Sequence, residues 1–155
     1  MEINSYPPEV TVNIQLSRHS RVTAGVLLLA LVTVETGGLY LVRVVGYGEE
    51  VTAFQLGFAR AGHAHAGVLL ILSLVALLYA DAARLTGAVG WLGRLCIPAA
   101  ALLMPGGFFF SSMGDGLTRP NSLIWMVWIG GVVLAIGLIT LGVSLLRSGV
   151  THPAD

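Results

Sequence analysis

The chain has little charge, no lysine and a single cysteine. Asp, Glu, Lys and Arg make up only 10% of its 155 residues, and the formal net charge is 0. This balance excludes the basic patch with which a nucleic-acid-binding protein neutralises phosphates. The one cysteine, Cys96, excludes an intrachain disulfide. The sequence has no phosphate-binding loop or nucleophile elbow, so whether it is an enzyme stays open.

Apolar residues are abundant instead, at 55% of the chain with a mean hydropathy of +0.85. They gather in four segments, residues 22–45, 58–80, 91–112 and 123–146. A helix of about 20 apolar residues is long enough to cross a bilayer. Backbone groups in lipid must be hydrogen-bonded within their own segment, and these segments are too long for barrel strands. The sequence therefore predicts an all-α integral membrane protein with four transmembrane helices and the lipid bilayer as a partner.

Short connections at residues 46–57, 81–90 and 113–121 favour antiparallel neighbours, and so an up-down bundle. Pro98 and Pro105 predict a kink in the third helix. A polar tail at 1–20, which we expect to be retained, and a short tail at 148–155 flank a transmembrane domain at 21–147.

The arginines predict the direction of the spans, because cytoplasmic loops carry more positive charge. One side is expected to hold five arginines and the other three. The sequence therefore predicts a multi-pass protein of the cell membrane with both termini in the cytoplasm. The two sets are Arg18, Arg21, Arg84, Arg94 and Arg147, against Arg43, Arg60 and Arg119.

Three ionisable residues lie inside the predicted spans. Glu35 is near the middle of the first, and His63 and His65 lie in the first third of the second. Such residues are functional candidates by default. At 1.5 Å per residue, Glu35 lies about 15 Å, His63 about 8 Å and His65 about 11 Å from the outer end of its helix. Asp115, in the third loop, falls on the same side, whereas the inner half is expected to be mostly aliphatic.

The spacing of the two histidines separates their roles. Residues i and i+2 of a helix point about 200° apart, so the two rings cannot face one centre. His63 shares a small and polar stripe, typical of a helix–helix contact, with Ala59, Arg60, Ala66 and Gly67. We therefore expect His63 to meet Glu35, and His65 to face a second helix, a subunit interface or a haem edge.

Our first hypothesis is a metal or haem site, because neutral imidazole is the commonest metal ligand in proteins. The predicted metal ligands are Glu35, His63, His65 and Asp115, a set that suits zinc, copper or iron. His63 or His65 would be an axial ligand of haem b. The other histidines, His19 and His152, lie outside the spans, so a bis-histidine haem would need two subunits and hence a homo-oligomer.

Two alternatives stay open. In the first, the chain is a structural or accessory subunit of a larger membrane complex, and Glu35, His63 and Arg60 satisfy one another. In the second, oligomers form a transporter for protons, ions or a small solute, because a buried glutamate beside a histidine can relay protons.

Overall fold

The computed structural model describes residues 15–151, which form four long helices. Each of the four is long and apolar enough to cross a membrane, which confirms the predicted helical class and the predicted number of long apolar helices. Of the two predicted end segments, 1–20 and 148–155, only residues 1–14 and 152–155 lie outside the described residues, and they include His152. The helices are α1 (Arg18–Tyr47), α2 (Ala53–Ala82), α3 (Gly87–Ser111) and α4 (Trp125–Thr151), with a short 3-10 helix, η1 (Ser122–Ile124), before α4.

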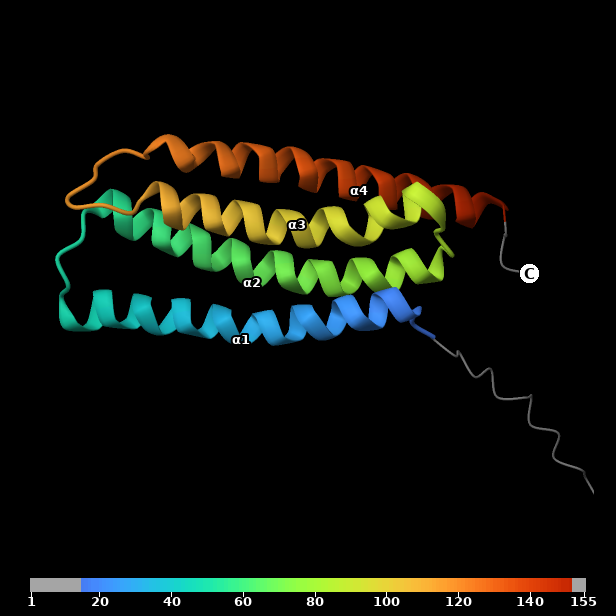
Figure 1. The fold of residues 1–155 in the computed structure, drawn as a ribbon, viewed down its shortest axis with the longest axis horizontal. Helices are drawn as coiled ribbons and strands as arrows, with labels where there is room; N and C mark the ends of the chain where they lie inside the picture. The colour runs from blue at the N-terminus through green and yellow to red at the C-terminus, as the bar shows by residue number, and fades with distance from the viewer. Residues whose placement is uncertain (1–14, 152–155) are drawn as a thin grey trace, which may run out of the picture.

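Successive helices run in opposite directions, and their order in space follows their order in the chain (Figure 1). Helix α2 packs against α1 and α3, and α3 packs against α2 and α4. Two loops, residues 48–52 and 112–121, therefore share one end of the molecule, which we call the two-loop end. The loop at residues 83–86 lies at the other, single-loop end together with the start of α1.

The core is built mainly by the two middle helices. The buried positions of α2 recur at helical spacing, and Leu77 of α2 and Ile97 of α3 are fully buried. In α1 the buried residues are only Ser20, Leu27 and Val44. Most of the α1 surface is therefore not covered by any other part of residues 15–151. The buried residues of α2 are Ala59, Gly62, Leu69, Leu70, Ser73, Ala76, Leu77 and Ala80.

Helices α1 and α2 extend beyond their predicted apolar spans because hydrogen-bonding caps set the ends of the helices. Helix α2 begins at Ala53, and not at residue 58, because Thr52 and Gln55 form a capping box. The Gln55 backbone N–H donates to the Thr52 hydroxyl at 3.1 Å, and the Thr52 backbone N–H donates to the side-chain Oε1 of Gln55 at 3.1 Å. At the other end α2 includes Asp81, which the sequence had placed in a loop.

Glycines let α3 and α4 approach closely. A Cβ atom added at Gly107 would lie 2.7 Å from the Val127 backbone nitrogen, and one at Gly130 would lie 2.5 Å from Met104 Cγ. Side chains larger than hydrogen do not fit at these distances. Gly107 of α3 and Gly130 of α4 therefore lie at close helix–helix contacts.

Candidate functional site

His63 reaches from α2 to the backbone of α1. A Cβ atom added at Gly37 would lie 3.4 Å from its Nδ1, and one at Gly38 would lie 3.5 Å from its Nε2. The nitrogen-bearing edge of the ring therefore faces the glycine pair of α1. These glycines make the recess that admits an imidazole between the two helices. The ring faces α1, as its stripe of small residues predicts.

His65 faces α3 instead. Its ring centroid lies 5.0 Å from that of Phe108, and its Nδ1 lies 2.8 Å from the Ala61 carbonyl oxygen. An imidazole whose Nδ1–H donates to a carbonyl keeps the lone pair on Nε2, which is the atom that a metal ion would take. The two histidines thus lie against different neighbours, and His65 has the ring nitrogen geometry of a ligand.

Glu35 does not join either histidine within the single chain. Its side chain is exposed, and it makes no hydrogen bond or ion pair with any residue from 15 to 151. Nor do any three His, Cys, Asp or Glu side chains of the described residues gather closely enough to hold a metal ion. The predicted set of Glu35, His63, His65 and Asp115 is therefore not assembled by one copy of the described chain.

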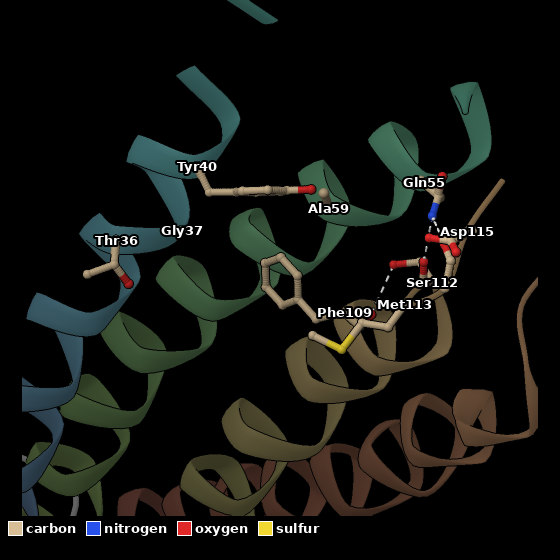
Figure 2. Close-up of a pocket in the computed structure, with 10 residues that line it drawn as sticks. Thr36, Gly37, Tyr40, Gln55, Ala59, Phe109, Ser112, Met113 and Asp115 are labelled. Carbon is tan, nitrogen blue, oxygen red and sulfur yellow. Dashed lines mark hydrogen bonds between the residues drawn. The ribbon is translucent and has the colours of Figure 1, made fainter. Parts of the chain in front are cut away.

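Asp115 lies at the two-loop end, where it lines a cavity of about 530 Å³. Figure 2 shows this cavity between α1, α2 and the end of α3, with the ring of Tyr40 reaching from α1 toward Ala59 of α2. Phe109 and Met113 supply apolar surface from the α3 side. The cavity combines apolar walls with a few polar groups, as small-molecule sites usually do. Its lining residues are Thr36, Gly37, Tyr40, Gln55, Ala59, Phe109, Ser112, Met113, Gly114 and Asp115.

Gln55 holds the rim of this cavity, a role that we did not predict. Its amide nitrogen donates to the carbonyl oxygens of Ser112 at 3.1 Å and Gly114 at 2.7 Å. The Thr52 hydroxyl donates to the Leu117 carbonyl oxygen, so three hydrogen bonds join the start of α2 to the loop after α3. The sequence signal for this corner is the capping box, Thr-x-x-Gln at 52–55, which we had read as loop.

The single-loop end holds a polar cluster where we expected aliphatic residues. Arg94 Nη2 lies 2.6 Å from Asp81 Oδ1, and Arg94 Nε donates to the Ser20 hydroxyl at 3.1 Å. The Ser17 backbone N–H donates to Asp81 Oδ2 at 2.8 Å. Arg94 also donates to the carbonyl oxygens of Leu85 and Gly90, both at 3.0 Å. This cluster, which we call the latch, joins α1, α2 and α3.

The latch has the character of a structural contact, because its charges satisfy one another. The side chains of Arg94 and Asp81 are only 13% and 8% exposed. Within the described residues no buried side-chain nitrogen or oxygen lacks a hydrogen-bond partner. A polar group that is already satisfied has little left to offer a substrate, so function is better sought at the two-loop end and on α1.

Comparison with known proteins adds no family to this picture. No protein-family model, no curated protein and no solved structure matches the chain.

Proposed function

We propose that the chain is a multi-pass membrane protein that serves as a subunit of an oligomer, joined through the outward face of α1. Glu35 carries this proposal. Its exposed carboxyl lies about 18 Å from the two-loop end of a 30-residue helix, at 1.5 Å per residue. The residues three, four and seven positions away on the same face are apolar and exposed: Leu28, Val32, Leu39 and Val42.

A charged side chain at this depth is unfavourable in lipid by about 3 kcal/mol. A second helix that covers the α1 face would remove Glu35 from lipid and give it a hydrogen-bond partner. A second copy is the simplest partner, because a two-fold axis brings identical surfaces together. A carboxyl group that carries its proton both donates and accepts, so two Glu35 side chains can bond reciprocally.

The membrane orientation belongs to the same proposal. The single-loop end, with five arginines, faces the cytoplasm, and the two-loop end, with three, faces outward. Both termini are then cytoplasmic. In the bilayer α3 is bent where Pro98 and Pro105, both inside the helix, remove backbone donors.

Disulfide crosslinking in native membranes tests the interface. In a Cys96→Ala background, Leu39→Cys places a thiol on the Glu35 face, 65% exposed, and Leu102→Cys places one on α3, 72% exposed. The two positions lie eight and nine residues from the ends of their helices at the two-loop end. We expect a crosslinked dimer from Leu39→Cys only. Equal crosslinking of both variants, or none in either, would contradict the proposal.

Metal or haem binding is a second candidate function, and the Nδ1 contact of His65 favours it. The Ala61 carbonyl oxygen, 2.8 Å away, selects the tautomer that leaves Nε2 open as a ligand. His63 is less available, because its ring nitrogens face the α1 backbone at Gly37 and Gly38. In an oligomer, two subunits would each supply one His65 as an axial ligand of haem b, or as part of a zinc, copper or iron site.

Absorption spectra and metal analysis of the purified oligomer test this second candidate. We expect a Soret band or stoichiometric metal that His65→Ala abolishes and His63→Ala retains. Protein with neither signal after supply of haem and metal ions would exclude it. The transport alternative is tested separately by proteoliposome flux, which Glu35→Gln should abolish if Glu35 relays protons or binds a cation.

A further inference from the structure

The cavity at the two-loop end has walls and a mouth of different chemistry. Its inner walls are the ring of Phe109, the methyl group of Ala59 and the backbone at Gly37. The side chains of Tyr40 and Met113 extend over it from opposite sides, as Figure 2 shows. A volume of about 530 Å³ is in the range that holds a small organic molecule.

Most polar atoms of the lining are already used within the protein. The Thr36 hydroxyl donates to the Thr33 carbonyl oxygen at 2.6 Å, and the Ser112 hydroxyl contacts the Phe108 carbonyl oxygen at 3.0 Å. The amide of Gln55 bonds the loop, as described above. Two groups have no partner among residues 15–151, namely the Tyr40 hydroxyl and the Asp115 carboxylate. A ligand would therefore be recognised by these two.

The charged residues around the opening of the cavity are acidic. A neighbouring hollow of about 730 Å³ shares Gln55, Gly114 and Asp115 with the cavity, and its other charged lining residue is Glu50. Among residues 15–151, no arginine lines either space. The aromatic rings inside the cavity offer faces that also attract cations.

We propose that this cavity binds a small organic cation, an ammonium group joined to an apolar body. The ammonium contacts the Asp115 carboxylate at the mouth, and the apolar body lies against Phe109, Met113 and the ring of Tyr40. An amine-headed lipid of the bilayer and a free amphipathic amine share this chemistry. The site is built by one chain, so this inference does not depend on the oligomer or on metal binding.

Calorimetric titration of benzyltrimethylammonium into the protein tests the site, with the protein held in phosphatidylglycerol nanodiscs that carry no amine lipid. We expect binding to the wild type, and binding about two- to fivefold weaker to Asp115→Asn, the size of one exposed ion pair. Thr36→Trp, which fills the cavity without changing charge, should also weaken it. Glu49→Gln is the matched control, because this exposed acid lines neither space.

Three outcomes would overturn the proposal. They are no binding to the wild type, equal binding to the wild type and Asp115→Asn, and an equal loss in Glu49→Gln. Binding of neopentylbenzene, the uncharged isostere, as tight as that of benzyltrimethylammonium would do so too.

A second set of nanodiscs, which contain phosphatidylethanolamine, distinguishes a lipid amine from a free amine as the ligand. A resident lipid amine should reduce the ratio of wild-type to Asp115→Asn affinity in these discs. An unchanged ratio points to a free amine as the ligand.

Discussion

The two ends of the molecule use similar residues for different purposes. At the single-loop end, Asp81 is nearly buried and bonded to Arg94 and to the Ser17 backbone. At the two-loop end, Asp115 is exposed at the mouth of a cavity and has no partner among residues 15–151. A carboxylate that is fully bonded fixes helices together, whereas one without a partner is free to meet a ligand. The two aspartates therefore differ in their partners and not in their type.

Breaking the latch should have the largest effect on stability. Asp81→Leu leaves the Arg94 guanidinium without its carboxylate in a nearly buried place, which we expect to cost about 3 kcal/mol of the free energy of unfolding. Titration with sodium dodecyl sulfate in mixed micelles measures it. The double variant Asp81→Leu/Arg94→Met removes both charges and should recover most of the loss. A single variant as stable as the wild type would show that the latch contributes nothing.

At the two-loop end, α3 and α4 are in close contact, whereas a cavity lies beside α1. We expect the α3–α4 contact to tolerate no added methyl group. Gly107→Ala forces a methyl group toward the Val127 backbone and should destabilise the protein by about 2 kcal/mol. Gly142→Ala on α4 is the control, because a Cβ atom there meets nothing within 4 Å. The same unfolding titration compares the two. Equal stability of both variants would refute the close α3–α4 contact.

A change at Gln55 should make the rim of the cavity more flexible and leave the rest of the fold unchanged. Gln55→Leu removes the bonds to the Ser112 and Gly114 carbonyl oxygens and the capping bond from the Thr52 backbone N–H, a loss of about 1–2 kcal/mol. Hydrogen exchange should rise in residues 113–120 and stay unchanged at the latch. Glu49→Gln serves as a control for a polar change at the same end. Unchanged exchange in the loop would show that Gln55 does not hold it.

The smallest effect on stability is expected at Asp115. Asp115→Asn changes an exposed side chain without a partner among residues 15–151, so the free energy of unfolding should stay within about 0.5 kcal/mol of the wild type. Its effect should instead be seen in cation binding. A destabilisation as large as that of Asp81→Leu would contradict the claim that Asp115, unlike Asp81, does not hold the fold together.

Hydropathy was sufficient to predict four helices, because each span is long and apolar. It placed the start of α2 five residues late, since a capping box of polar residues extends the helix beyond its apolar part. The spacing of His63 and His65 correctly separated their directions. The latch was not predicted, because a hydropathy profile cannot pair Asp81 with Arg94 across two helices. Position along a helix does not give direction around it, so Glu35 lies near the middle of α1 and still faces away from the bundle.

The assembled mass of the protein tests the central claim, that Glu35 lies at a contact between copies. Native mass spectrometry from nanodiscs should find an oligomer for the wild type and for Glu35→Gln, because an amide also donates and accepts. Glu35→Leu keeps the apolar face but loses the hydrogen bond, and it should shift the protein to the monomer. A monomeric wild type, or an oligomer that Glu35→Leu leaves intact, would contradict the account.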